Sequence, residues 1–169
     1  MTGSDPESGA SATSDVTPPK VRLWVARHAP VADISICYGR MDVAVKLLPE
    51  QAAANLLAAY QGDPPRRVWY SPASRCRLVA EHLAATLGIP LTVDEALGEL
   101  HLGVWEGRPW SAIRNEEREA YAAWMDDWQH LAPHGGERPA DIEARVRAWL
   151  PRRAAPLDRA AARNDSSAR

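Results

Sequence analysis

The run VRLWVARHAP, residues 21–30, is apolar until it ends on the charged pair Arg27-His28. A short run of this composition predicts a buried β-strand over about residues 21–26, with the pair delivered to one edge of a sheet. In open α/β sheets, ligands bind outside the carboxyl ends of the strands. Arg27 and His28 are therefore candidate site residues, although the run alone also fits a pair that ends the strand and faces water.

The bulk composition is that of an ordinary single globular domain. The chain has 169 residues, of which 46% are hydrophobic and 25% charged, with a formal net charge of −2. So small a net charge gives no general attraction for nucleic acid or an anionic membrane. Cys37 and Cys76 are not spaced as metal ligands. No apolar run approaches the length of about 20 residues that spans a bilayer, and no signal peptide is evident. These features predict a cytoplasmic enzyme or binding domain without a metal, a nucleic-acid partner or a membrane partner.

Strand and helix patterns alternate between two polar tails. Residues 1–20, rich in Ser, Gly, Thr and Pro, predict a disordered tail, and residues 151–169 predict a polar tail rich in Arg and Ala. Residues 21–150 between them predict one domain. Further patterns predict strands near residues 67–70 and 89–93, and helices that begin at Pro49, Ser71-Pro72, Glu116 and Pro139. This alternation predicts an α/β fold of three layers, in which helices flank a mainly parallel sheet.

Three separated segments carry the residue types that phosphoryl transfer needs. Arg27-His28 follows the first predicted strand, and Arg75 falls in the first turn of a predicted helix, where free N–H groups favour an anion. The third segment, residues 97–107, has the pattern of a glycine-containing loop with the carboxylates Glu99 and Glu106. Two arginines, a histidine and a carboxylate can bind a phosphoryl group, attack it and protonate a leaving group.

These segments resemble the motifs of the histidine phosphatase superfamily, which includes the cofactor-dependent phosphoglycerate mutases. Arg27-His28 resembles the family's Arg-His-Gly, with Ala29 in place of the glycine, and Arg75 resembles the arginine of its Ser-Pro-x-x-Arg. Glu99 falls at the catalytic acid, before the closing Trp105-Glu106-Gly107. The segment from Gly135-Gly136-Glu137 to Arg145-Val146 is also similar, so the likeness covers about residues 21–150. It implies a phosphoglycerate mutase-like fold.

Within the family, the segment Cys37-Tyr38-Gly39-Arg40-Met41-Asp42 is most similar to α-ribazole phosphatases, which act in cobalamin assembly. That likeness implies a substrate-binding role for Tyr38 and Arg40. The same turn also fits a purely structural role, and related phosphatases carry similar residues there.

The resemblance implies a phosphomonoester hydrolase that acts through a phosphohistidine on a small phosphorylated metabolite, with α-ribazole phosphate as one candidate. His28 would attack as a neutral ring, and water would then hydrolyse the phosphohistidine. Arg27 and Arg75 would hold phosphoryl oxygens with their planar guanidinium groups. Glu99 would protonate the leaving alkoxide, whereas Glu106 fits a structural role better. No metal or cofactor is implied.

One expected element has no counterpart in the sequence. The family has a second pocket histidine on a late apolar strand, but residues 151–169 contain no histidine and no strand-like run. We therefore expect a sheet that lacks the usual last strand, through truncation or a frame change, and hydrolysis that is impaired. The alternatives are a relative that only binds phosphate ligands and a phosphoglycerate mutase-type phosphotransferase. A mutase needs a second phosphate pocket, for which we find no basic cluster, so phosphatase is preferred; the oligomeric state is not predicted.

Overall fold

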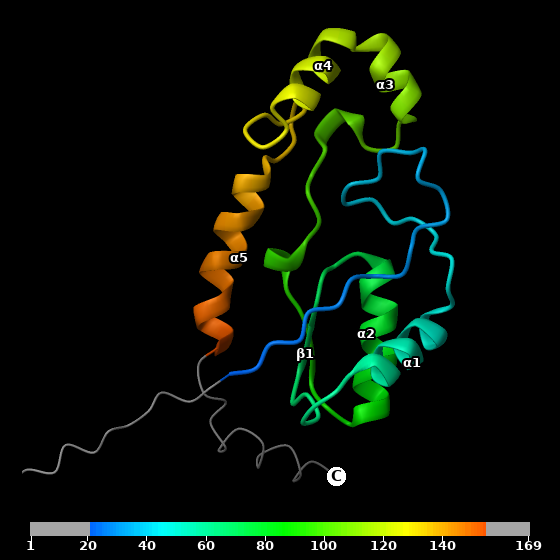
Figure 1. The fold of residues 1–169 in the computed structure, drawn as a ribbon, viewed down its shortest axis with the longest axis vertical. Coiled ribbons are helices and arrows are strands. Elements are labelled where there is room, and N and C mark those ends of the chain that lie inside the picture. Colours follow the sequence, from blue (N-terminus) through cyan, green and yellow to red (C-terminus); the bar gives the residue numbers. More distant parts are fainter. Residues whose placement is uncertain (1–20, 155–169) are drawn as a thin grey trace, which may run out of the picture. The chain divides into compact units, whose positions relative to one another are not determined.

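Helices and short strands alternate along the computed structural model, which describes residues 21–154 (Figure 1). The predicted tail of residues 1–20, and residues 155–169 of the predicted tail 151–169, lie outside the described residues, whereas residues 151–154 are the last turn of a helix and not part of a tail. In chain order the elements are α1 (Pro49–Ala59), β1 (Val68–Tyr70), α2 (Ser74–Leu87), β2 (Leu91–Val93), the 3-10 turns η1 (Glu95–Leu97) and η2 (Gly103–Trp105), α3 (Trp110–Glu116), α4 (Arg118–Asp126) and α5 (Pro139–Ala154).

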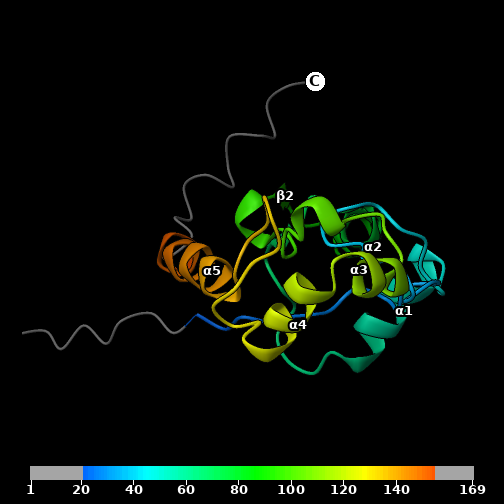
Figure 2. The ribbon, with the colours of Figure 1, turned by 90° about the horizontal axis from the view of Figure 1, so that it is seen from above.

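β1 and β2 form a two-stranded parallel sheet in which Val68 pairs with Leu91. Successive side chains of a strand point to opposite faces of its sheet. Val68 packs against the cluster between α1 and α2, whereas Trp69 meets Trp149 of α5 edge-on, with 5.8 Å between ring centroids. Helices therefore cover both faces, with α5 on one side and α1 and α2 on the other (Figures 1 and 2). The predicted α/β fold, a parallel sheet flanked by helices, is confirmed.

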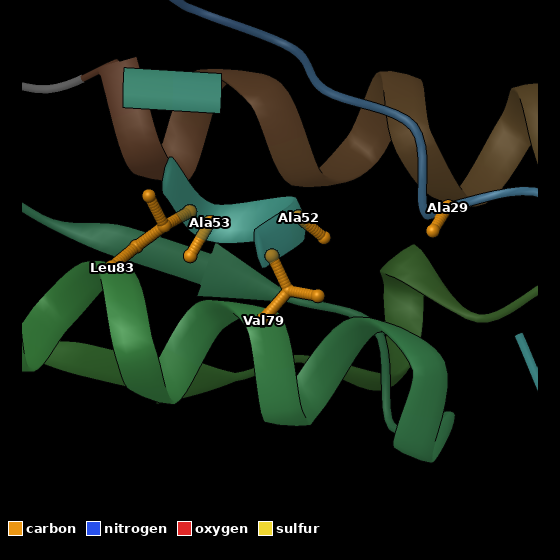
Figure 3. Packing of buried hydrophobic residues seen from close by; sticks show 5 residues of the cluster. All are labelled: Ala29, Ala52, Ala53, Val79 and Leu83. Atoms are coloured by element: carbon orange, nitrogen blue, oxygen red, sulfur yellow. The ribbon is translucent and has the colours of Figure 1, made fainter. Parts of the chain in front are cut away.

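Small side chains bring α1 and α2 together. A buried cluster joins the two helices to the end of the first segment and consists of Ala29, Ala52, Ala53, Val79 and Leu83 (Figure 3). The alanines let the two helices approach closely, and burial of Val79 and Leu83 contributes roughly 1.5–3 kcal/mol each. This cluster fixes the backbone at Ala29, directly after the Arg27-His28 pair.

A second buried cluster supports the predicted loop of residues 97–107. It consists of Cys37, Leu102, Trp105 and Ile113. The ring of Trp105 is 1% exposed, lies edge-on to Trp124 of α4 at 5.5 Å, and donates from Nε1 to Glu117 at 2.8 Å. Apart from η1 and η2 the segment is irregular, as predicted, and this packing holds it in place.

The predicted strand over residues 21–26 is wrong. In the part of the chain that the structure describes, this segment forms no ladder with β1 or β2, and Leu23 and Val25 are 48% and 79% exposed. Backbone pairing begins only at Pro30, whose carbonyl oxygen accepts the N–H of Lys46, and Val31 forms an isolated antiparallel bridge with Val45. The physical reason is that a strand needs a neighbouring backbone to bond with, and residues 21–154 offer this segment none. The apolar composition of residues 21–26 therefore predicted a strand without showing whether a neighbouring strand exists.

The predicted start of α2 is also wrong. Ser71-Pro72 has the composition of a helix N-terminus, but α2 begins at Ser74 and its preceding residue Ala73 makes no side-chain cap. The backbone N–H of Ser74 instead donates to the carboxylate of Asp42 at 2.6 Å. A side chain from a distant turn therefore replaces the local cap.

The helix predicted over residues 116–131 is found only as α4, Arg118–Asp126, and α3 is a separate helix that ends at Glu116. Glu117 lies between the two helices with φ −121° and ψ 46°, and its carboxylate bonds Trp105 and Arg108. The predicted packing role of Trp124 is confirmed, but Trp128 lies beyond the end of α4 and is 49% exposed. The spacing of apolar residues predicted a helix that includes Glu117, because such spacing does not detect the bonds that Glu117 makes with Trp105 and Arg108.

Candidate active site

The Arg27-His28 pair lies where the extended first segment reaches α1 and α2. His28 is half-buried, and its Nδ1 lies 2.6 Å from the carbonyl oxygen of Ala29. Because a carbonyl oxygen only accepts, the proton belongs on Nδ1, and Nε2 keeps its lone pair when the ring is neutral. Nε2 is buried and has no hydrogen-bond partner among the described residues. Its lone pair is therefore not engaged by any other described group.

Arg27 and His28 line a cavity of about 230 Å³. Its other walls come from Ala29, Pro30, Leu47, Ala52, Asn55, Leu56 and Val79. Arg27 is exposed. The volume is below the roughly 300–1,000 Å³ of pockets for drug-sized ligands but is large enough to hold a phosphoryl group.

Arg75, the second residue of α2, is 3% exposed and fixes the turn of residues 38–42. Its Nη1 donates to the carbonyl oxygen of Met41 at 2.7 Å and its Nη2 to that of Gly39 at 2.9 Å. Its guanidinium carbon also lies 5.3 Å from the ring centroid of Tyr38. These bonds use two of the five N–H donors of the guanidinium group, so three remain for an anion.

Arg40 and Glu99 line a second cavity of about 50 Å³ beside the start of α2, together with Ser71 and Pro72. The Nε of Arg40 donates to the backbone carbonyl oxygen of Glu99 at 3.0 Å. The Glu99 side chain is exposed, and its Oε1 accepts the N–H of Leu100 at 2.9 Å. Its position is therefore set mainly by the loop backbone.

The structure brings the predicted site residues together only in part. Arg27 and His28 share one cavity, Arg40 and Glu99 share the other, and Arg75 lines neither. His28 and Glu99 therefore line different cavities. A proton donor for a leaving group must come within hydrogen-bond reach of the group that His28 attacks. The catalytic roles of these residues remain predictions.

Glu106 has the structural role expected for it. Its Oε1 accepts the backbone N–H of Arg40 at 3.0 Å and that of Leu102 at 2.9 Å. Gly39, with φ 42°, lies directly against this carboxylate, and a Cβ there would stand 2.1 Å from Oε1. The bonds join the Tyr38–Arg40 turn to the loop after Glu99.

Two further residues of the site, Glu137 and Arg145, received no role from the sequence. The Oε1 of Glu137 pairs with Arg40 at 2.6 Å, and Arg145 donates to the carbonyl oxygens of Ala96 and Gly98. Both residues belong to the segment that resembles the histidine phosphatases, and this resemblance was the signal by which the sequence could have identified them. Their contact with the Glu99 loop joins positions that are far apart in the chain, and residue spacing does not predict such contacts.

The cysteine and the potential metal ligands of the described residues show whether thiol or metal chemistry fits this site. Burial raises the pKa of the Cys37 thiol to about 12, so this cysteine is no thiolate nucleophile. Within residues 21–154, His, Cys, Asp and Glu side chains form no group of three suited to hold a metal ion. No helix of that same range has the length and hydrophobicity needed to cross a membrane.

Comparison with known proteins gives consistent matches. The family model of the histidine phosphatase superfamily (branch 1) matches residues 23–159. The chain is 29% identical over 134 residues to the adenosylcobalamin/alpha-ribazole phosphatase of Escherichia coli, with 78% of this chain and 66% of that protein covered. It is 37% identical over 134 residues to the glucosyl-3-phosphoglycerate phosphatase of Mycobacterium tuberculosis, with 75% and 57% covered.

A solved structure shows the same fold. The alpha-ribazole phosphatase of Shigella flexneri superposes with a TM-score of 0.62 at 25% identity, with 70% of this chain and 58% of that chain covered. The present chain thus spans less than two thirds of the length of each of these three proteins.

Proposed function

This chain belongs to branch 1 of the histidine phosphatase superfamily, and we propose from that premise that it hydrolyses a small phosphate monoester through a phosphohistidine at His28. The observation that carries the proposal is that His28 lines the larger cavity together with Arg27, while its Nε2 has no partner among the described residues. A neutral imidazole nitrogen in that state is a nucleophile placed next to a cation that attracts phosphate.

In the proposed reaction, Nε2 of His28 attacks phosphorus and the bond from phosphorus to the ester oxygen breaks. Glu99 gives a proton to the leaving alkoxide. Water then gives a proton to the Glu99 carboxylate and attacks the phosphohistidine; the bond from phosphorus to Nε2 breaks, which releases inorganic phosphate and restores the neutral ring. Arg27 and the three unused N–H donors of Arg75 would offset the charge on the phosphoryl oxygens, which is the main requirement of phosphoryl transfer.

The proposal requires movement, because His28 and Glu99 line different cavities. The extended segment before His28 forms no ladder with either strand in the described chain and exposes Val25 by 79%. A segment with so few backbone bonds has a low free energy of local opening. Substrate binding would therefore draw the Arg27-His28 pair toward Glu99 while the cluster between α1 and α2 holds Ala29.

The similar proteins suggest which phosphate esters to test. One of them is an adenosylcobalamin/alpha-ribazole phosphatase and another a glucosyl-3-phosphoglycerate phosphatase. We take α-ribazole phosphate as the first candidate, with Tyr38 and Arg40 on the substrate-binding side of the site. Such charged metabolites do not cross a bilayer unaided, which makes the cytoplasm the proposed location.

A second candidate function is phosphate binding without normal turnover. The observation that favours it is the separation of the predicted residues into two cavities, together with the use of two Arg75 donors by the carbonyl oxygens of Gly39 and Met41. Loss of one charge-stabilising group at such a site costs about 10²–10³ in rate. This candidate predicts measurable binding of inorganic phosphate with poor hydrolysis.

The first experiment measures p-nitrophenyl phosphate hydrolysis by the wild type, His28→Ala and the control His82→Ala, from about pH 5 to about pH 8. His82 lies on α2 with a half-exposed side chain and lines neither cavity. The hydrolase proposal expects turnover in the wild type and His82→Ala that falls to background in His28→Ala. Equal background rates in all three would contradict it.

Phosphate binding by titration calorimetry separates the second candidate from a chain without a site. Binding that survives His28→Ala and is lost in Arg27→Ala, but not in the exposed control Arg66→Ala, would support a binding protein. No saturable binding by the wild type would contradict both candidate functions.

A further inference from the structure

Resting on the proposed role of Glu99 as proton donor, we propose that Glu137, together with Arg145, is a positioning residue that holds Glu99 in place through its backbone. The Glu99 side chain itself bonds only the adjacent N–H of Leu100 among the described residues. Its carboxyl group therefore goes where the backbone of residues 98–100 places it.

The carbonyl oxygen of Glu99 is bonded from two sides. The Nε of Arg40 donates to it at 3.0 Å, and the Nη2 of Arg145 donates to it at 3.2 Å. Arg145 also donates to the carbonyl oxygen of Gly98 at 2.5 Å and to that of Ala96 at 2.6 Å. Two guanidinium groups thus donate hydrogen bonds to three backbone carbonyl groups at and before the proposed proton donor.

One carboxylate holds both arginines. The Oε1 of Glu137 pairs with Nη2 of Arg40 at 2.6 Å, and its Oε2 lies 3.5 Å from Nη2 of Arg145. The side chains of Glu137 and Arg145 are 24% and 19% exposed, so water competes only weakly for these bonds. Charge-assisted bonds of this kind are roughly twice as strong as neutral ones.

Glu137 also binds the far end of the same loop. Its backbone N–H donates to the carbonyl oxygen of His101 at 2.7 Å, and its Oε2 accepts the N–H of His101 at 3.1 Å. The loop is therefore fixed on both sides of Glu99, by arginines before it and by the His101 peptide after it. A displacement of about 1 Å at a reacting group can cost about 10²-fold in rate.

The test compares two substrates that differ in their need for a proton donor. Phenyl phosphate releases a weakly acidic phenol and needs protonation, whereas p-nitrophenyl phosphate releases a more acidic phenol and needs little. We expect Glu137→Gln and the conservative Arg145→Lys to lose about 10²-fold in kcat on phenyl phosphate but only a few-fold on p-nitrophenyl phosphate. Glu99→Gln should give the same contrast.

The double variant Glu99→Gln/Glu137→Gln sharpens the test. If Glu137 acts through Glu99, the double variant is no slower than Glu99→Gln alone, because the effects of residues that act as a unit do not add. The matched control is Glu143→Gln, an exposed carboxylate of α5 that pairs with Arg147, and it should leave both rates unchanged. Equal losses on both substrates, or additive effects in the double variant, would overturn the proposal.

A measurement without turnover keeps this inference separate from the proposed function. If the wild type hydrolyses neither ester, the proposed function fails, and amide hydrogen exchange then decides the positioning claim. Glu137→Gln should speed exchange about tenfold or more at the N–H groups of Leu100 and His101, with α1 and α2 unchanged. Unchanged exchange at these two amides would overturn the claim.

Discussion

The carboxylate of Asp42 accepts the backbone N–H of Ser74 at 2.6 Å and thereby caps α2 from a turn 32 residues earlier. This bond, followed by one from the Ser74 side chain, holds the pKa of Asp42 below its ordinary value. Arg75 in the same turn of α2 bonds back to Gly39 and Met41. The segment that carries Tyr38 and Arg40 is therefore tied to α2 in both directions.

Replacing Asp42 by alanine should lower the free energy of unfolding by about 1 kcal/mol, the usual cost of a lost helix cap. Because the folded-state pKa is lowered from 3.8, the stabilisation is present above that pH and is lost as the pH falls through the lower folded value. Urea unfolding should show a constant difference from the wild type near neutral pH that shrinks below about pH 4. The control Asp126→Ala, an exposed carboxylate of α4, should show neither effect.

Replacing Trp105 by phenylalanine tests the cluster under the Glu99 loop. The change keeps an aromatic ring but removes the Nε1–H that donates to Glu117 at 2.8 Å. Loss of this bond, together with the space that the smaller ring leaves in the buried cluster, should lower the free energy of unfolding by about 1–3 kcal/mol. The control Trp128→Phe alters a side chain that is 49% exposed and should change it by less than about 0.5 kcal/mol. Equal costs in urea unfolding would contradict the assignment of Trp105 to the core.

Replacing Gly39 by alanine tests the close approach of the turn to Glu106. Gly39 and Gly88 both have positive φ, 42° and 64°, so alanine strains the backbone at either position. Only at Gly39 would the added Cβ meet the Glu106 carboxylate, at 2.1 Å, because nothing lies within 4 Å at Gly88. Gly88→Ala should cost about 1 kcal/mol in chemical unfolding, and Gly39→Ala distinctly more. Similar decreases in the free energy of unfolding for the two variants would show that the Glu106 side chain moves aside without a cost in stability, which would contradict this prediction.

Local elements of this fold follow from residues a few positions apart. Pro49 begins α1 because its fixed φ and missing N–H suit the first helical position, and Gly88 ends α2 in the left-handed conformation. The parallel pair Val68–Tyr70 and Leu91–Val93 coincides with two short β-type runs separated by a helix. Each signal acts within one element, so one sequence suffices to detect it.

Contacts between segments that are distant in the chain could not be predicted from local sequence signals. The motifs identified His28, Arg75 and Glu99 as residue types suited to phosphoryl transfer, but not whether they meet. Where each of these residues lies depends on tertiary bonds such as that of Glu137 with Arg40, between positions that no spacing rule connects. The predicted first strand was wrong for a related reason, since a strand depends on its neighbour as well as on its own side chains.

Replacing Val25 by alanine tests the conformation of the segment before His28. A central strand would bury this side chain, and its truncation would then cost about 2 kcal/mol or more. In the structure Val25 is 79% exposed, so Val25→Ala should change the free energy of unfolding by less than about 0.5 kcal/mol. Val31→Ala is the matched control, because Val31 is also extended but is 4% exposed and bridges Val45, and it should show the larger cost. Equal losses in urea unfolding would mean that the segment is covered in solution, which would contradict the exposed conformation and restore the predicted strand.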